Sequence, residues 1–275
     1  MSEKPARLWR YCPRNGALLW KIMFLEPDLV VCENRLEETN KTFFTCLLLQ
    51  SGKEVLKDFT LEERVGKPVP ECCMTGLETA RGSLFYIHGY QDNSPEHAGI
   101  WAVDPIKASV VWARPGAAFV ANLEAGMLVY SAGSFAGFPE RSYMLLDCMT
   151  GEVIDTIGED AQRANALRRE SLSDEEIQKV LLPGVPEPGC SIPGLSGDGF
   201  GEYIEHDGGL VTVIHTPGKG GEGFDATIRG YRKGSMVYED ILAAGTAVPC
   251  VNYFLLRGVT LYYIRNMNEL ISVRL

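Results

Sequence analysis

Positive charge and long apolar runs are both scarce in this sequence of 275 residues. Lys and Arg number 26 against 36 Asp and Glu, which gives a net charge of −10, and no basic run exceeds two residues. A surface for nucleic acid or an anionic membrane needs clustered positive charge, so we expect neither partner. No stretch approaches the roughly 18 apolar residues of a membrane span. The N-terminus has early charges where a signal peptide has its apolar core, so we expect a cytoplasmic location.

Complete catalytic signatures are missing as well. The eight cysteines include no Cys-x-x-Cys pair, and most lie in apolar runs, which indicates reduced, buried thiols. The glycine-rich segment 217–223 lacks the Lys-Ser/Thr ending of a phosphate-binding loop. The segment 194–198 is one residue short of the Gly-x-Ser-x-Gly motif. The sequence therefore favours no reaction class, and we predict no cofactor.

What the sequence does contain is a repeated unit of two apolar strands joined by a tight turn, often ending in an aromatic residue. The five copies are Leu8–Trp20, Phe44–Leu56, Ile100–Trp112, Tyr143–Ile154 and Ile228–Tyr238. Repeats of this size that consist of strands alone are typical of a β-propeller.

Two further apolar runs complete each unit to a four-stranded blade. The clear pairs are Gly76–Ala80 with Leu84–His88, Ala118–Asn122 with Met127–Ser131, Glu202–His206 with Leu210–His215, and Asn252–Leu256 with Leu261–Arg265; the first blade has the less clear pair Ile22–Leu25 with Leu29–Glu33. Short glycine-containing turns join the first strand to the second in the clear pairs. We predict an all-β, five-bladed propeller, with six blades as the alternative.

The two ends of the chain are expected to pair and close the propeller. Leu270–Leu275 is the third strand of the last blade, and the N-terminal hairpin supplies the missing outer strands. Such closure leaves no sheet edge open to aggregation. Which N-terminal strand lies beside Leu270–Leu275 is left open.

One segment, residues 159–200, interrupts the repeat between the third and fourth blades. Glu159–Arg169 has acids at its start and bases at its end, as the helix dipole favours. Ser173–Glu176 forms a capping box, and a Pro/Gly-rich stretch follows from Pro183. We predict a single domain over residues 1–275 that contains this helical and Pro/Gly-rich insertion.

Two segments resemble a known family. His88–Asp104 (HGYQDNSPEHAGIWAVD), followed by Val111 and Trp112, resembles an uncharacterised bacterial β-propeller family of unknown function. Leu146–Glu152 (LDCMTGE) is similar to the strand–turn–strand signature of quinoprotein-like (PQQ-type) blade repeats. The resemblance implies a propeller without a known activity. It does not imply quinone binding, because these motifs are structural.

The connections from second to third strands are predicted to be long, and all lie on one face of a propeller. They are Asn34–Thr42, Gly89–Gly99, Ala132–Arg141 and Thr216–Phe224. Long loops on a rigid scaffold commonly carry binding sites. We therefore expect a ligand on this long-loop face, with the helical insertion as a candidate lid.

The first polar residue after each second strand lies at the mouth of the same face. These residues are Glu33, His88, Ser131, His215 and Arg265. Two histidines, a carboxylate and a guanidinium suit an anionic or polar ligand. A simpler and more common interpretation is that polar residues mark where strands emerge into solvent.

His88 and His97 lie nine residues apart with Asp92 and Glu96 between them. These residue types suit a metal, but their spacing matches no recognised zinc site, and loop histidines more often bond to backbone carbonyls. We therefore predict no metal and include Asp92 and His97 among the ligand-binding residues.

Two functions stay open. The first is a non-catalytic cytoplasmic propeller that binds a protein or small polar ligand on its long-loop face. The alternative is a hydrolase or lyase that acts on a carbohydrate or similar polar substrate at the channel mouth. A histidine and two carboxylates within reach of one pocket would favour the enzyme. The sequence does not decide between them.

Overall fold

The computed structural model describes residues 6–61, 75–90, 96–187, 192–195, 200–218 and 223–275. These residues form an all-β structure of five four-stranded antiparallel sheets with two α-helices. The chain divides into two compact units: Trp20–Gln178, and Lys179–Leu275 together with the N-terminal residues up to Leu19. We describe each unit by itself.

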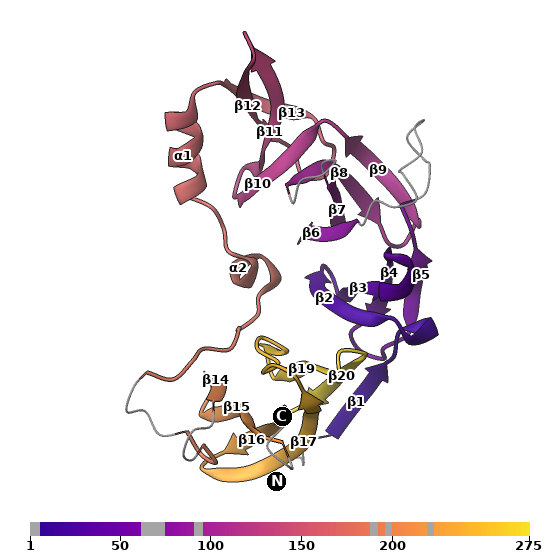
Figure 1. The fold of residues 1–275 in the computed structure, drawn as a ribbon, viewed down its shortest axis with the longest axis vertical. Helices are drawn as coiled ribbons and strands as arrows, with labels where there is room; N and C mark the ends of the chain where they lie inside the picture. Colours follow the sequence, from indigo (N-terminus) through magenta and orange to yellow (C-terminus); the bar gives the residue numbers. More distant parts are fainter. Residues whose placement is uncertain (1–5, 62–74, 91–95, 188–191, 196–199, 219–222) are drawn as a thin grey trace. The chain divides into compact units, whose positions relative to one another are not determined.

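The first unit contains three sheets whose strands follow one another in chain order (Figure 1). Their strands are β2 (Leu18–Leu25), β3 (Leu29–Leu36), β4 (Lys41–Leu48) and β5 (Glu54–Phe59); β6 (Gly76–Arg81), β7 (Leu84–Tyr90), β8 (His97–Asp104) and β9 (Ser109–Arg114); and β10 (Ala117–Leu123), β11 (Gly126–Phe135), β12 (Phe138–Leu146) and β13 (Val153–Gly158). The strand pairs expected in these three sheets are confirmed.

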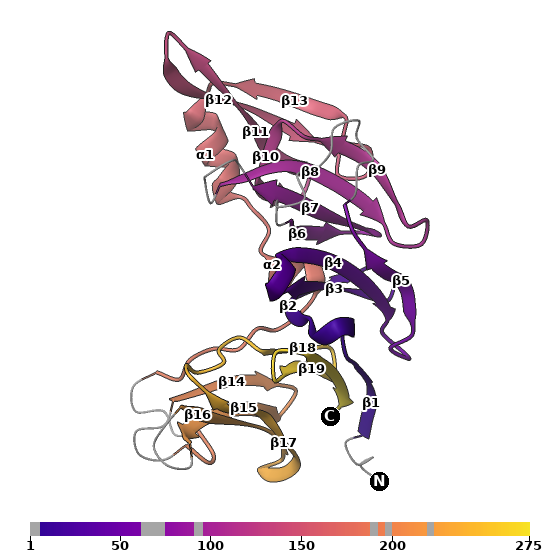
Figure 2. The same ribbon diagram turned by 45° about the vertical axis from the view of Figure 1, so that its right-hand side comes forward.

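The second unit contains the other two sheets (Figure 2). One consists of β14 (Phe200–His206), β15 (Gly209–Pro217), β16 (Phe224–Arg232) and β17 (Ser235–Thr246). The other has the order β1–β20–β19–β18, from β1 (Ala6–Tyr11), β18 (Phe254–Arg257), β19 (Thr260–Arg265) and β20 (Glu269–Arg274). The two ends of the chain therefore share a sheet, and β1 is the N-terminal strand beside β20.

The expected N-terminal hairpin Leu8–Trp20 is wrong. Its first strand pairs with β20, whereas its second strand, β2, begins the next sheet. Pro13 and a 3-10 turn at Arg14–Gly16 separate the two strands, and Asn15 and Gly16 both take positive φ. This connection leads the chain into the next sheet. A two-residue turn would instead pair the second strand with the first.

Successive sheets within a unit pack face to face, because their middle strands are apolar on both faces. Every residue of β7 from Leu84 to Gly89 is buried. In the first unit, Phe44 of β4 and Phe85 of β7 belong to one core cluster. In the second unit, Ile228 of β16 and Tyr263 of β19 belong to another. Strands buried on both faces explain why the sequence shows apolar runs where a surface strand would alternate.

The prediction of a long loop is wrong at two of the four connections between second and third strands. The segment Ala132–Arg141 is largely strand, because β11 and β12 form a hairpin with a two-residue turn at Ala136-Gly137. Both turn residues take positive φ, as a tight hairpin requires. Between β3 and β4 there is one 3-10 turn, η2 (Glu37–Thr39). Central parts of the other two connections, 91–95 and 219–222, lie outside the described residues.

Both predicted helices of the insertion form. The helix α1 (Ala161–Arg169) is capped by Asp160, whose side chain accepts the Arg163 N–H at 2.9 Å. Ahead of α2 (Asp174–Gln178), the Ser173 N–H donates to Glu176 Oε2 at 2.7 Å, and the Glu176 N–H donates to Ser173 Oγ at 3.2 Å. These reciprocal bonds are a capping box.

The insertion follows the edges of first strands, which differs from the expected lid. In the first unit, the Leu172 N–H donates to Asn122 O at 2.8 Å, and the Phe24 N–H donates to Gln178 Oε1 at 3.1 Å. In the second unit, Leu181 bridges to Leu256 and Gly184 to Tyr203. A first strand has a free edge with unpaired backbone groups. The insertion supplies partners to those groups.

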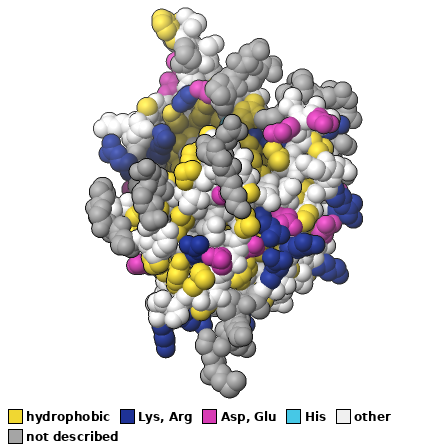
Figure 3. Space-filling model, turned by 60° about the horizontal axis from the view of Figure 1, so that its bottom comes forward, with side chains coloured by type: hydrophobic (Ala, Val, Ile, Leu, Met, Phe, Trp, Pro, Cys, Tyr) yellow, Lys and Arg dark blue, Asp and Glu magenta, His cyan; other side chains and the backbone are white. Residues whose placement is uncertain are grey.

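Neither helix among the described residues could cross a membrane, since the longer, α1, has nine residues. On the face drawn in Figure 3, Lys and Arg side chains lie beside Asp and Glu side chains. The positive charge visible there is therefore interspersed with negative charge.

Candidate functional site

Three of the five polar residues at the second-strand ends are buried. The exposed fraction is 1% for Glu33, 5% for His88 and 1% for His215. Ser131 and Arg265 are half-buried. The simpler interpretation, that these residues mark where strands emerge into solvent, is therefore wrong for Glu33, His88 and His215. Buried polar groups need partners, so the surroundings of each one matter.

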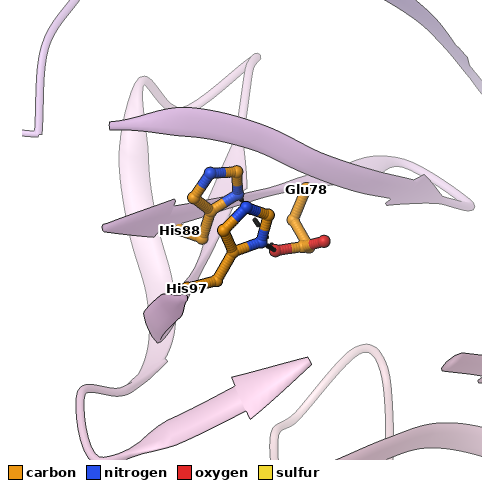
Figure 4. Close-up of side chains that lie close together, drawn as sticks. All are labelled: Glu78, His88 and His97. Carbon is orange, nitrogen blue, oxygen red and sulfur yellow. Dashed lines mark hydrogen bonds and ion pairs between the residues drawn. The ribbon is translucent and has the colours of Figure 1, made fainter. Parts of the chain in front are cut away.

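The fold brings His88 and His97 together with a third residue, Glu78. Glu78 Oε2 lies 2.7 Å from His97 Nδ1 and 3.0 Å from His88 Nδ1. The two imidazole rings stack with their centroids 3.5 Å apart and an angle of 7° between their planes (Figure 4). We call these three residues the Glu78 cluster.

Strand geometry explains how the cluster assembles. Alternation along β7 places His88 on the same face as Leu84 and Tyr86, which pack in the core with Met127 and Val129 of β11. On β6, the pairing register shifts between Leu77 and Thr79, so Glu78 is the extra residue of a bulge. A bulge re-aims the side chain of its extra residue, and here the carboxylate reaches the histidines.

Gly76 makes room for the His88 ring. It pairs with His88 across the sheet, and a Cβ at position 76 would lie 2.6 Å from both Cε1 and Nε2 of that ring. Carbon atoms do not approach so closely without displacement. The glycine therefore leaves the space that the buried ring occupies.

Among the described residues, only His97 forms a hydrogen bond to the Glu78 carboxylate. An ionised carboxylate accepts only, so Nδ1 of His97 carries the proton and donates to Oε2. Because the rings are parallel, one oxygen cannot lie in both ring planes. Within the described part of the chain, neither nitrogen of His88 forms a hydrogen bond, although Nδ1 is close to Oε2. His88 is thus a buried imidazole with unused hydrogen-bonding capacity.

Electrostatics keep Glu78 ionised. Burial raises its pKa, but interactions with His88 and His97 outweigh burial and hold the pKa at about 2. The hydrogen bond to Glu78 raises the pKa of His97, against partial burial. Both effects favour an ion pair between Glu78 and a protonated His97.

Charged groups of neighbouring elements surround the cluster. Lys21 Nζ of β2 donates to the backbone oxygens of Leu77 and Glu78 at 3.1 and 3.2 Å. Asp174, which is exposed at the start of α2, interacts electrostatically with both Lys21 and Glu78. Tyr90 meets both histidine rings edge-on, with centroids 5.1 and 5.4 Å away. Lys21, Asp174 and Tyr90 are therefore among the described residues that border the cluster.

Glu33 touches the strand that carries the cluster, but its carboxylate is already engaged. Oε2 accepts the Leu77 N–H at 2.8 Å, and Oε1 accepts from Arg35 Nε at 2.6 Å. The Arg35 guanidinium lies over the Trp20 ring, 4.1 Å from its centroid. Glu33 thus connects β3 to β6 next to Glu78.

The second unit repeats half of the cluster. His88 pairs with Gly76, two residues before Glu78, and His215 likewise pairs with Phe200, two residues before Glu202. His215 Nε2 lies 3.8 Å from Glu202 Oε2, with side chains 0% and 3% exposed. Neither His215 nitrogen has a hydrogen-bond partner among the described residues. The same histidine–glutamate pair therefore occurs on two sheets.

The remaining predicted residues lie elsewhere. In the second unit, Arg265 pairs with Asp240 at 3.1 Å and with Glu269, so its guanidinium is occupied within the fold. In the first unit, Ser131 lies in the strand ladder opposite Ala117. Asp92 lies outside the described residues.

Sequence reasoning missed Glu78 and Glu202. The available signal was a glutamate on the first strand, two residues beyond the position opposite a second-strand histidine. Using it required the strand register, which the bulge at Glu78 shifts by one residue.

A separate cleft of about 490 Å³ lies at the tight-turn ends of the first unit. Its lining includes Arg81, Glu124, Asp147 and Glu176. The cleft and the Glu78 cluster lie at opposite ends of the strands of this unit. The expected site on the long-loop face therefore does not coincide with this cleft.

Comparison with known proteins gives one family match. A profile described as a domain of unknown function (DUF4905) matches residues 25–112, which include the whole Glu78 cluster and the segment His88–Asp104. No curated protein matches the chain. The bacterial origin and the quinoprotein-like repeats implied by the resemblance stay predictions.

The chain is also similar to solved structures at low scores. An acylaminoacyl peptidase from Pyrococcus horikoshii matches at 12% identity and a TM-score of 0.33, over 90% of this chain and 36% of that one. A glycosyl hydrolase from Bacteroides ovatus matches at 8% identity and a TM-score of 0.32, over 98% of this chain and 89% of that one. The β-propeller domain of the Trilobed protease from Pyrococcus furiosus matches at 10% identity and a TM-score of 0.29, over 92% of this chain and 72% of that one. This chain spans just over a third of the peptidase chain, and TM-scores this low carry no argument about function.

Proposed function

We propose that this protein is a non-catalytic binding module that takes a small polar ligand at the Glu78 cluster. The observation that carries the proposal is His88, which is 5% exposed and whose ring nitrogens lack hydrogen bonds within the described residues. The carboxylate close to His88 is that of Glu78, which already accepts a hydrogen bond from His97.

The free energy of burial supports this assignment. Leaving a buried polar group unpaired costs about 1–3 kcal/mol, and natural structures rarely tolerate it without a use. An apolar residue at position 88 would avoid that cost, since Leu84 and Tyr86 on the same face are already apolar. A ligand that bonds the free His88 nitrogen would offset the cost, and half-exposed His97 gives it access.

The other residues of the predicted site take supporting places in this proposal. Glu33 holds the β6 backbone next to Glu78. Asp92 stays a proposed ligand contact, because it lies in the connection that leads to His97. Ser131, His215 and Arg265 lie at the corresponding strand ends of other sheets, and we assign them no contact with the ligand of the Glu78 cluster.

We further propose that the five sheets are the blades of one closed propeller, located in the cytoplasm. The sheet β1–β20–β19–β18 supports closure, because it joins the first and last strands of the chain. The shared strand order of the other sheets supports five equivalent blades.

Thermal shift with small polar probes tests the binding function. We would measure the melting temperature with inorganic phosphate, citrate, glucose and imidazole, each at millimolar concentration, for the natural chain, His88→Leu and the control His206→Ala. A bound ligand stabilises the folded state by mass action. We expect at least one probe to raise the melting temperature of the natural chain and of His206→Ala, but not of His88→Leu. Equal shifts in all three proteins, or no shift with any probe, would contradict the proposal.

One observation favours the alternative, a hydrolase or lyase. The 2.7 Å contact between His97 and Glu78 is a histidine–carboxylate pair of the kind that positions a general base. The second carboxylate nearby, Glu33, is engaged by Arg35 and the Leu77 N–H, so it is not free for catalysis. Turnover of nitrophenyl glycosides that is lost in His97→Ala would support the enzyme.

A further inference from the structure

We propose that Glu78, His88 and His97 bind a divalent first-row transition metal ion, with Zn²⁺ as the first candidate. This inference rests on the proposed function, because it names the ligand of the same site. It departs from the sequence-based prediction of no metal, which was made without Glu78.

The donor set suits such an ion. One ligand atom from each of the three residues lies within 4.8 Å of the other two. Two imidazoles and one carboxylate are a recurring protein ligand set for zinc and ferrous iron, and they leave positions open for water or a small molecule.

His88 supplies the independent observation. Its side chain is buried, and its Nδ1 lies 3.0 Å from Glu78 Oε2 without the alignment of a hydrogen bond. A metal ion bound at Nδ1 would use the lone pair that no described residue uses. Burial holds this ring in the space that Gly76 leaves open, so the ligand is pre-positioned.

One ring must turn for the ion to bind. The in-plane lone pairs of two parallel imidazoles do not converge on one point. Ligand atoms of a tetrahedral zinc site lie about 3.3 Å apart, given bonds of 2.0–2.2 Å. The present contacts of 2.7 and 3.0 Å are shorter. The ring that turns is His97, whose side chain is 39% exposed, whereas buried His88 stays in place.

Charged side chains near the cluster affect the binding of a cation. The ammonium of Lys21 opposes a second cation, although it already donates to two backbone oxygens. Asp174, which interacts electrostatically with Glu78, favours the cation. The Glu78 carboxylate, itself a ligand, offsets the charge of Lys21, so the local charge is compatible with a divalent ion.

The comparison with the second unit gives a control within the same chain. Glu202 and His215 share the register of Glu78 and His88, but no third donor groups with them among the described residues. Glu202 Oε1 is also occupied by the Asn252 N–H at 3.0 Å. We therefore assign the metal to the first unit.

Calorimetric titration of the whole chain tests the proposal. The protein would be stripped with EDTA and titrated separately with Zn²⁺ and Co²⁺, in a Cys12→Ser background because Cys12 is an exposed thiol. The variants are Glu78→Gln and His97→Ala, whose side chains are less constrained than His88, with His215→Ala as the matched control. We expect one ion per chain, and an affinity at least tenfold weaker in both cluster variants but unchanged in His215→Ala.

The absorption spectrum of the Co²⁺ complex identifies the ligands. We expect ligand-field bands without thiolate charge transfer, because the ligands are nitrogen and oxygen. A thiolate band, or equal binding by the natural chain and the two cluster variants, would overturn the metal proposal. If metal binding fails but a probe still shifts the melting temperature through His88, only this inference is wrong. If both fail, the proposed function is wrong as well.

Discussion

At the scale of single residues, the contact between His97 and Glu78 has a protonation state that stability measurements can read. The hydrogen bond to Glu78 raises the pKa of His97 above its ordinary value of 6.5. The cluster lowers the pKa of Glu78 from 4.5 to about 2. Between the two ordinary values, the folded chain therefore holds a negative Glu78 and a positive His97.

The sign of the pH dependence follows from these shifts. A raised histidine pKa contributes stability that is complete below pH 6.5 and is lost as pH rises through the folded pKa. A lowered glutamate pKa contributes stability above pH 4.5 that is lost as pH falls toward 2. With EDTA present, His97→Asn should cost about 0.5–1 kcal/mol at pH 5.5 and less at pH 8.5, because half-exposed ion pairs are weak.

Urea unfolding of the natural chain and His97→Asn at the two pH values measures this difference. The control is the same substitution in a Glu78→Gln background, where the pH dependence should disappear. A cost that is equal at both pH values would show that His97 gains nothing from Glu78.

At the scale of elements, the insertion stabilises first strands by hydrogen bonding to their edges. Gln178 ends α2, is buried, and accepts the Phe24 N–H of β2 at 3.1 Å. An apolar residue there would leave a buried backbone donor without this partner. The capping box at Ser173 fixes the start of the same helix.

Gln178→Leu should lower the free energy of unfolding by about 1–3 kcal/mol, the cost of an unpaired buried group. Glu175→Gln is the control, because Glu175 is exposed on the same helix and should change stability by less than about 0.5 kcal/mol. Hydrogen exchange of the Phe24 amide reports the bond itself. Unchanged protection of that amide in Gln178→Leu would contradict the assigned role of the insertion.

The sequence predicted elements well where local signals were strong. Apolar runs bounded by glycine turns located strands such as β6 and β7, and the Ser173–Glu176 pattern located a helix start. It failed at the connection 132–141, because polar residues beyond the buried part of β11 and β12 still pair as an exposed hairpin. Polarity reports burial there, whereas strand pairing depends on the partner chain segment.

The candidate site was only half predictable for a related reason. His88 and His97 were found because histidines are few and stand near strand ends. Glu78 was missed because its position depends on a bulge that displaces the register of β6. Its role depends on three strands meeting, and neither the spacing nor the composition of one strand contains that information.

At the scale of the whole chain, the paired termini carry stability that two tryptophans can separate. Trp9 of β1 is buried and packs against Tyr262, with ring centroids 6.0 Å apart. Trp20 of β2 is 53% exposed and contacts the Arg35 guanidinium. The sequence pattern predicts both residues in one hairpin, yet they belong to different sheets.

Trp9→Ala should therefore cost about 3–5 kcal/mol, as expected for removing a buried aromatic side chain. Trp20→Ala should cost about 1 kcal/mol or less, the value of an exposed cation–π contact. Urea unfolding followed by circular dichroism gives both numbers. Equal costs would mean that β1 does not dock against β20 as described.

The ring nitrogens of the four histidines test the ligand site most directly. Long-range ¹H–¹⁵N spectra resolve both nitrogens of His88, His97, His206 and His215, so two of the residues serve as internal controls. On addition of one equivalent of Zn²⁺, we predict that the Nδ1 resonances of His88 and His97 shift together, while those of His206 and His215 stay in place. Unchanged His88 resonances, or equal shifts at all four residues, would contradict a metal site at Glu78, His88 and His97.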